Sequence, residues 1–204
     1  MSLVFDSGLI PVVAQDRVSG EIRMVAFANA EAVRRTLESG KATFFSRSRG
    51  ELWEKGQTSG NAMDVSAVLV DCDADCLVYL VAPRGPTCHT GAATCFFRRL
   101  APDGTIATDA VPTPTALARL EAVIEARKQS TASASYVKSL FDGGAEKIGG
   151  KLREEADELA RAVASESDDR VVSEAADVVF HILVALRSRS LPLDLVLREL
   201  DRRS

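Results

Sequence analysis

Residues 65–95 read VSAVLVDCDADCLVYLVAPRGPTCHTGAATC, and this stretch decides the fold of the first half of the chain. Two runs of β-branched and apolar residues, 65–70 and 77–81, flank a short turn made of aspartate and cysteine. Runs of this composition on either side of a turn favour β-strands. The pattern therefore predicts that the two runs pair as a hairpin, with the Asp/Cys turn at its tip.

The same stretch concentrates groups that bind metal ions: Asp71, Cys72, Asp73, Asp75, Cys76, Cys88, His89 and Cys95. Thiolates suit zinc, whereas carboxylates suit magnesium. Two unlike metal sites so close in sequence suggest hydrolytic chemistry on a substrate that carries phosphates. Plainer interpretations stay open. Aspartate favours turns, free cysteines are often small buried hydrophobes, and the histidine can be a ligand, an acid/base or a satisfied loop residue.

Upstream of the hairpin the pattern predicts more strands and one helix. The expected strands are 9–16, 22–28 and 43–46. Asn29 is placed to cap a helix over 31–39, which Gly40 would end.

A polar, glycine-rich and locally basic stretch, 46–61, follows. Hydroxyls, glycine amides and basic side chains can together cradle a phosphate, and a tryptophan can stack on a base. A solvated surface loop explains the same composition. The candidate substrate-binding residues here are Arg47, Arg49, Trp53, Lys55, Thr58 and Ser59.

The order of these motifs resembles the phosphoribosyl-AMP cyclohydrolase family over about residues 5–98. The likeness is carried by GLIPVV (8–13), FSRSR (45–49), ELW (51–53), KG (55–56), TSGN (58–61), DCDAD (71–75), and CHTG (88–91) with Cys95. The resemblance implies a homodimer in which both subunits contribute to a zinc site at the interface. The implied ligands are Cys72, Cys88 and Cys95 for zinc, and Asp71, Asp73 and Asp75 for magnesium.

The resemblance also implies a reaction, the hydrolytic opening of the adenine ring of phosphoribosyl-AMP between N1 and C6. Three thiolates leave one zinc position for water, whose pKa zinc lowers towards about 7. His89 is the expected acid/base, because an unperturbed histidine titrates near neutrality. Cys76 matches no ligand of the family and is expected in the core of the second hairpin strand. Residues 71–75 are expected to be extended, so that their side chains alternate between two sides and one short segment can serve two different ions.

The second half of the chain has a different pattern. Residues 100–115 have the composition of a linker, and beyond them helices are predicted over about 117–128, 151–164 and 171–187. Acidic residues border the apolar stripes of the last two helices and could meet between them. Glu154 and Glu158 share one face of the first helix, with Glu155 on the flank, and Glu174 and Asp177 share a face of the second. Carboxylates without enough cations are costly unless metal ions neutralise them, although a solvated acidic face is the plainer interpretation. His181 is interpreted as structural.

EEADE (154–158) followed by EAAD (174–177) resembles phosphoribosyl-ATP pyrophosphohydrolase over about residues 113–200, with matching flanks SYVK (135–138), LF (140–141) and KI (147–148). The resemblance implies hydrolysis between the α- and β-phosphates, with Glu155 and Asp177 as catalytic residues. The implied magnesium ligands are Glu154, Glu155, Glu158, Glu174 and Asp177. Lys147 or Lys151 is expected to contact phosphate. The pair Gly149–Gly150 departs from the family, because glycines weaken a helix start.

The two resemblances support each other, because the product of the second domain is the substrate of the first, at the second and third steps of histidine biosynthesis. We therefore expect a bifunctional hydrolase that uses Zn²⁺ and Mg²⁺. Its expected domains are a mostly-β α+β cyclohydrolase domain over 1–108 and an all-α, pyrophosphohydrolase-like domain over 113–204. The alternative is a structural zinc module fused to a helical dimerisation domain. A zinc nucleobase deaminase would need His-x-Glu and Pro-Cys-x-x-Cys, which do not occur.

The two resemblances imply small-molecule phosphoribosyl nucleotides as partners, and the composition argues against other classes of partner. The formal net charge of −4 argues against nucleic acid, which needs a concentrated basic face. No apolar run reaches the length of a membrane span, and the first residues lack the sections of a signal peptide. We therefore expect a cytoplasmic protein without a membrane partner. Its four cysteines would stay reduced in that compartment. They are therefore interpreted as metal ligands or buried residues in preference to disulfides.

Overall fold

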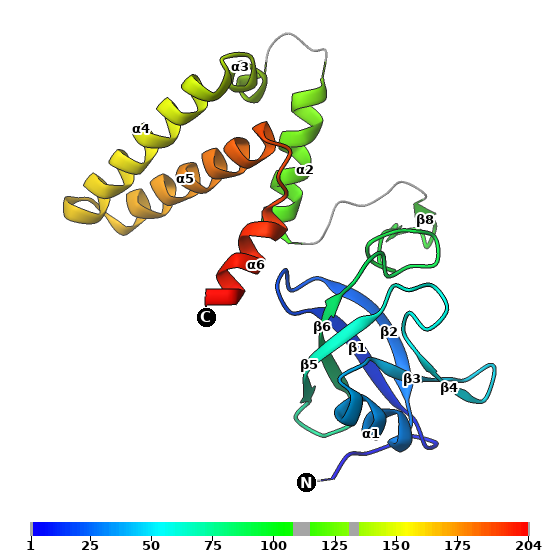
Figure 1. Ribbon diagram of the computed structural model, residues 1–204. Coiled ribbons are helices and arrows are strands. Elements are labelled where there is room, and N and C mark those ends of the chain that lie inside the picture. Colours follow the sequence, from blue (N-terminus) through cyan, green and yellow to red (C-terminus); the bar gives the residue numbers. More distant parts are fainter. Residues whose placement is uncertain (1, 108–114, 131–134, 204) are drawn as a thin grey trace. The chain divides into compact units, whose positions relative to one another are not determined.

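A computed structural model describes residues 2–107, 115–130 and 135–203. The chain divides into two compact units, 1–111 and 112–204 (Figure 1). Over the described residues, unit 1 is mostly sheet with one helix of 10 residues, and unit 2 is helical, which confirms the expected fold classes. The expected domain boundaries, 108 and 113, lie outside the described residues.

Unit 1 is built on a curled six-stranded sheet with the strand order β4-β3-β2-β1-β6-β5 (Figure 1). Paired strands run antiparallel, except that β1 and β6 are parallel. The elements of the sheet and its helix are β1 (Ile10–Asp16), β2 (Ile22–Ala28), α1 (Ala30–Ser39), β3 (Thr43–Ser46), β4 (Glu51–Glu54), β5 (Met63–Val70) and β6 (Leu77–Pro83). A separate two-stranded ribbon consists of β7 (Arg99–Leu100) and β8 (Ile106–Ala107).

The core of unit 1 lies between this sheet and α1. Ile10, Val12 and Ala14 of β1 are fully buried and cluster with Ala32 and Val33 of α1. Side chains alternate along a strand, so the intervening residues of β1 point to the opposite face. That second face of the sheet is partly exposed.

Helix α1 begins and ends at the residues that the sequence indicates. Asn29 Oδ1 accepts the N–H of Ala32 over 2.8 Å and so caps the first turn. Gly40 follows the last turn with φ of 65°, and its N–H donates to Thr36 O over 2.9 Å. The predicted cap and stop are both confirmed.

The predicted hairpin is also confirmed, because β5 and β6 pair antiparallel with Val70 opposite Leu77. The expectation that Cys76 lies in the core is wrong. Cys76 directly precedes β6 and is only partly buried, whereas Leu77 is 1% exposed. Since side chains alternate, the residue before a core position faces away from the core.

Two short pairings arise where the sequence suggests only loop or linker. Strand β4 pairs with β3 inside the polar stretch, with Phe44 opposite Trp53 and their ring centroids 5.0 Å apart. The β7–β8 ribbon begins at Arg99, one residue before the predicted linker, and otherwise lies inside it; residues 108–114 of that linker are outside the described part. Strands this short are stabilised by the strands with which they pair and by aromatic packing between strands. The residue pattern of one segment alone does not reveal such interactions.

Unit 2 consists of helices (Figure 1). Their apolar sides pack together into one core. The helices are α2 (Ala116–Gln129), α3 (Tyr136–Asp142), α4 (Gly144–Ser165), α5 (Asp168–Ser188) and α6 (Leu193–Arg203). The core residues are Ile124, Val137, Leu140, Ile148, Leu183 and Val184. Among the described residues, no helix is both long enough and apolar enough to cross a membrane.

Helix α4 begins well before its predicted start at Lys151, so Gly149 and Gly150 lie in its interior. Ile148 is 3% exposed in the core of unit 2. This packing, rather than intrinsic helix propensity, stabilises the first turns of α4. The glycine pair therefore does not mark a helix start.

Replacing Gly150 with alanine is expected to raise the free energy of unfolding by about 0.5–1 kcal/mol, because it removes backbone entropy from the unfolded chain. A side chain there would meet no atom within 4 Å. Gly144 has equally open surroundings but φ of 66°, so Gly144→Ala is the matched control and should destabilise. Urea denaturation of both variants measures the difference. Equal shifts of the two midpoints would contradict this account.

Candidate active sites

The two downstream thiols meet in one loop, 87–95, that follows β6. The N–H of Cys88 donates to Ala92 O over 3.0 Å, which folds the loop on itself. Cys88 and Cys95 line the same cavity, and each thiol shifts the pKa of the other. Hydrogen bonds from the Thr90 side chain and N–H lower the pKa of the Cys88 thiol. Desolvation of the Cys95 thiol, followed by the charge of Cys88, raises the pKa of Cys95, although the residue as a whole is exposed. The pair forms a soft-donor site in which one thiolate is favoured.

A cavity of about 400 Å³ adjoins this thiol pair, and His89 also lines it. A second cavity of about 1070 Å³ has Trp53, Lys55, Ser59 and His89 in common with the first. Five of the six candidate residues of the polar stretch line one or both cavities: Arg49, Trp53, Lys55, Thr58 and Ser59. The structure therefore brings this part of the predicted substrate site together with the thiols.

His89 and Lys55 line both cavities and can carry a proton or a charge there. His89 Nδ1 is 3.9 Å from Cys88 Sγ. Lys55 is only 8% exposed, and its Nζ donates to Asn61 O over 3.2 Å. The turn after Lys55 needs glycine, because Gly56 has φ of 89° and a Cβ there would lie 2.3 Å from the backbone nitrogen of Ala62. The lysine charge is thus held at the wall of the cavity.

The three aspartates lie together, but in a tight turn rather than in an extended segment. Carboxylate oxygens of Asp71, Asp73 and Asp75 lie within 4.8 Å of one another, and all three residues are exposed. Asp71 Oδ1 accepts the N–H groups of Asp75 and Cys76 over 3.0 and 3.1 Å. Ala74 has φ of 64°. The alternation expected of an extended chain is wrong, because the carboxylate that closes the turn makes the three groups converge.

The charges of this turn influence each other. Desolvation opposes ionisation of Asp71, but the N–H of Cys76 and the side chain and N–H of Asp75 outweigh it and lower its pKa. The hydrogen bond with Asp71, followed by the charge of Asp73, raises the pKa of Asp75. Three carboxyl groups this close repel one another when ionised, which a cation would relieve.

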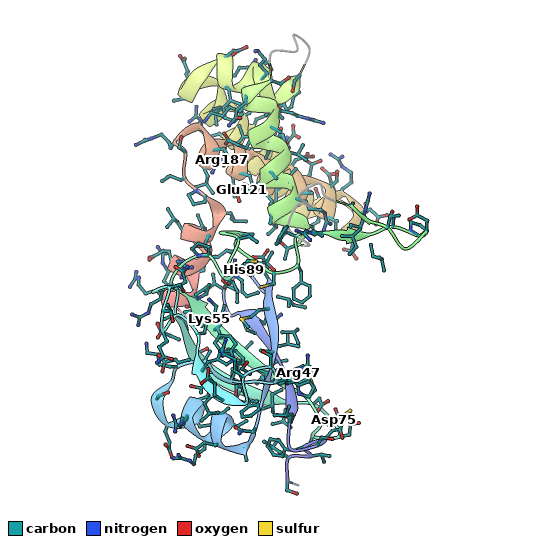
Figure 2. All side chains as sticks on the ribbon, turned by 90° about the vertical axis from the view of Figure 1, so that its right-hand side faces the viewer. Arg47, Lys55, Asp75, His89, Glu121 and Arg187 are labelled. Atoms are coloured by element: carbon teal, nitrogen blue, oxygen red, sulfur yellow. The ribbon has the colours of Figure 1, made fainter. Side chains whose placement is uncertain are left out.

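Within one chain, the aspartate turn and the thiol pair lie apart. Figure 2 shows Asp75 at one end of unit 1 and His89 towards the other, with Arg47 nearer Asp75. Arg47 and Asp75 line a cavity of about 490 Å³. Cys72 belongs to the turn, and among the described residues it does not group with Cys88 and Cys95. Nearness in sequence therefore does not unite the three predicted zinc ligands within one chain.

In unit 2, helices α4 and α5 bring carboxylates together across their interface. Oxygens of Glu155, Glu158 and Glu174 lie within 4.8 Å of one another. The buried stripe of α4 passes through Ile148, Glu155 and Ala162, so this glutamate points inward although the sequence placed it on the flank. Glu154 was expected to share the face of Glu158, but its side chain is 55% exposed. Asp177 is exposed too, outside the group.

Basic side chains already neutralise part of this cluster, which the sequence argument did not anticipate. Lys151 Nζ lies 3.3 Å from Glu155 Oε1, and the guanidinium of Arg170 contacts Glu174. The spacing of four residues between Arg170 and Glu174 on α5 is a signal that could have revealed this pair. Lys147, the other phosphate candidate, donates instead to a serine of α3 over 3.3 Å.

His181 is closer to this cluster than the sequence suggested. It is 3% exposed, its Nδ1 lies 2.8 Å from Asp177 O, and its Nε2 lies 2.9 Å from the hydroxyl of Tyr136. A carbonyl only accepts, so Nδ1 carries a hydrogen, and in the neutral ring Nε2 accepts from the tyrosine. The same Nδ1 is 3.9 Å from Glu155 Oε1. The spacing of Asp177 and His181 on one helix face was the available signal.

Comparison with known families accounts for each unit. The model of the phosphoribosyl-AMP cyclohydrolase family matches residues 24–97, which hold the aspartate turn and the thiol pair. The model of the phosphoribosyl-ATP pyrophosphohydrolase family matches residues 117–204, which hold the carboxylate cluster. Fold and sites together thus define a two-domain hydrolase of phosphoribosyl nucleotides.

Relatives that contain both parts are similar along nearly the whole chain. A histidine biosynthesis bifunctional protein HisIE from Pyrococcus furiosus is 40% identical over 97% of this chain and 92% of its own. Proteins of the same name from Deinococcus radiodurans and Escherichia coli K12 are 46% and 39% identical, over 90% and 96% of this chain and 84% and 91% of theirs. This chain belongs to the family of bifunctional histidine biosynthesis proteins HisIE.

The chain is therefore a bifunctional enzyme. Its second unit cleaves phosphoribosyl-ATP to phosphoribosyl-AMP and pyrophosphate, and its first unit opens the adenine ring of phosphoribosyl-AMP. The alternative of a structural zinc module fused to a dimerisation domain is not favoured by these matches.

Proposed function

We propose that unit 1 performs ring opening with zinc held by Cys72, Cys88 and Cys95. The observation that carries this proposal is that Cys88 and Cys95 line one cavity and shift each other's pKa. Paired thiols with a favoured thiolate fit a borderline ion such as zinc. When bound, zinc supplies an acidified water and polarises the substrate. A spectrophotometric assay of phosphoribosyl-AMP, which follows the absorbance of ring opening, tests the reaction, and the zinc content of the purified protein tests the ligands.

The other residues of the cavity have roles that follow from their chemistry. His89 is placed to hold a proton and deliver it to the purine ring. Trp53 offers a face on which the base can stack. Arg49, Lys55, Thr58 and Ser59 would hold the substrate phosphates with charge and hydroxyl donors.

The proposed zinc site needs a second copy of the chain, because Cys72 does not reach the thiol pair of its own chain. The sheet face opposite α1 is suited to such an interface. A row of apolar side chains crosses it from strand to strand: Val25, Val13, Val78 and Leu69. Val25 is 46% and Leu69 is 48% exposed. A homodimer through this face would bury the row and supply the missing thiol to each site.

Complementation between two inactive variants tests the shared site. Cys72→Ser and Cys88→Ser chains are each expected to lose ring opening. When they are unfolded together and refolded as a mixture, each mixed dimer has one site with all three thiols. The mixture should recover roughly a quarter of the wild-type activity, since half of the dimers are mixed and half of their sites are intact. Refolding each variant separately is the control. No recovery in the mixture would contradict the shared site.

In the same unit, Asp71, Asp73 and Asp75 are proposed to hold magnesium, since their oxygens converge and are hard donors. Arg47 lines the cavity beside Asp75 and would contact a substrate phosphate there. The turn-closing hydrogen bonds of Asp71 leave its other carboxylate oxygen for a cation.

In unit 2, magnesium is proposed to be held by Glu155, Glu158 and Glu174, with Glu154 and Asp177 at the rim. The convergence of the first three oxygens across two helices supports this assignment. When bound, magnesium neutralises charge on the polyphosphate and activates water. Lys151 lies within the cluster and can pass from Glu155 to an incoming phosphate, whereas Lys147 would have to leave its serine partner. The reduced thiols suit the cytoplasm, and we propose that compartment for the enzyme.

A further inference from the structure

A buried group of charges lies between the β1–β2 hairpin and the thiol loop, outside the residues assigned so far. It consists of Arg23 on β2, Asp16 at the end of β1, and Glu21 in the turn between the strands. Asp16 is 1% and Glu21 is 6% exposed. Arg23 Nη2 lies 2.6 Å from Asp16 Oδ2, and Nη1 lies 2.9 Å from Glu21 Oε2. Buried charges must be paired, so the two carboxylates fix the direction of the guanidinium.

The same arginine is attached to the loop that carries the thiols. Its Nη1 donates to Ala93 O over 3.2 Å, and its backbone carbonyl accepts the N–H of Cys95 over 2.8 Å. Arg23 therefore holds the loop on both sides of Thr94, once through its side chain and once through its backbone.

Thr94 provides a separate anchor for the same loop. Its Oγ1 donates to Ile22 O over 2.7 Å and accepts the N–H of Phe96 over 3.1 Å. The residue is 8% exposed. Between 89 and 96 it is the single buried residue, so the position of the loop depends on these polar contacts rather than on apolar packing.

We propose that Arg23, held by Asp16 and Glu21, is a positioning residue for the thiol pair. It fixes the backbone on which Cys95 sits, so that this thiol meets Cys88. The inference rests on the proposed zinc function of unit 1, because a metal site tolerates little displacement of its ligands. Groups that orient metal ligands without touching the metal typically change metal affinity by about 10–100-fold when they are replaced.

The test measures zinc affinity of the full-length protein by competition with a chromophoric chelator. Arg23→Met removes the guanidinium at similar length and should weaken zinc binding by about 10–100-fold. Thr94→Val alters the second anchor without touching any charge and should change affinity in the same direction. Arg34→Met is the matched control, because Arg34 lies on α1 in exposed ion pairs with Glu31 and Glu38. It should bind zinc as the wild type does.

Hydrogen exchange of the Cys95 amide in the metal-free protein gives a second measurement, and Arg23→Met and Thr94→Val should both accelerate it. Should Arg23→Met fail to fold, Arg23→Lys keeps the charge beside Asp16 but not the planar fork, and the same loss of affinity is expected. Wild-type zinc affinity in these variants, with unchanged Cys95 exchange, overturns the proposal. A wild-type protein that binds no zinc contradicts the proposed function instead, and the Cys95 exchange rate then decides the role of Arg23.

Discussion

The Cys88→Ser variant is expected to lose ring opening of phosphoribosyl-AMP by about a thousandfold or more, while it still releases pyrophosphate from phosphoribosyl-ATP. Serine keeps the size of the side chain but is a poor zinc ligand, so the change removes a donor without creating a cavity. Unit 2 has its own core and its own carboxylate cluster, which the substitution does not touch. Both assays run on one preparation, and the zinc content of that preparation is measured alongside them.

Cys76→Ser is the matched control for that experiment. Cys76 is a partly buried thiol outside the pair, and burial followed by the charge of Asp71 raises its pKa, so it is a poor thiolate. The control is expected to keep its zinc and both activities. Retention of zinc and ring opening by Cys88→Ser would show that the thiol pair does not form the metal centre.

Local elements of the fold could be predicted because short-range interactions decide them. Asn29 caps the start of α1 and Gly40 caps its end, both through hydrogen bonds to residues within the helix. The β5–β6 hairpin follows from two apolar runs that flank a turn. The meeting of carboxylates from two helices was predictable from helical periodicity, since acidic residues border both apolar stripes and those stripes pack together. The family resemblances extended these local inferences to two activities.

The rest depends on contacts between distant segments. Whether Glu154 or Glu155 faces α5 is decided by the rotation of α4, which Ile148 and Ala162 set through their burial. Whether Cys72 reaches Cys88 is decided by the length of β6 and the path of the following loop, which place them apart. The contacts of Arg23 with that loop join segments that no pattern in the sequence relates.

Glu155→Gln is expected to reduce pyrophosphate release by roughly a hundredfold or more, because it removes one negatively charged oxygen ligand from the carboxylate cluster that would hold magnesium. Folding should survive the change. Glutamine has the shape of glutamate, its carbonyl can still accept from Lys151, and one negative charge fewer relieves repulsion among the three oxygens that lie within 4.8 Å. A pyrophosphate assay over a range of magnesium concentrations measures the loss, and urea denaturation measures stability.

Asp157→Asn is the matched control, since it removes the same charge from an exposed position of α4 outside the cluster. It should leave pyrophosphate release unchanged. Glu154→Gln tests the rim of the cluster and should cost less than Glu155→Gln. The Glu154 side chain is 55% exposed, and its Oε1 lies 3.0 Å from Lys151 Nζ rather than among the three converging oxygens. Equal losses in all three variants would point to a general effect of charge. Unchanged pyrophosphate release in a variant that carries both Glu155→Gln and Asp177→Asn would show that these carboxylates take no part in the reaction. Intact ring opening in every variant would show that the defect is confined to unit 2.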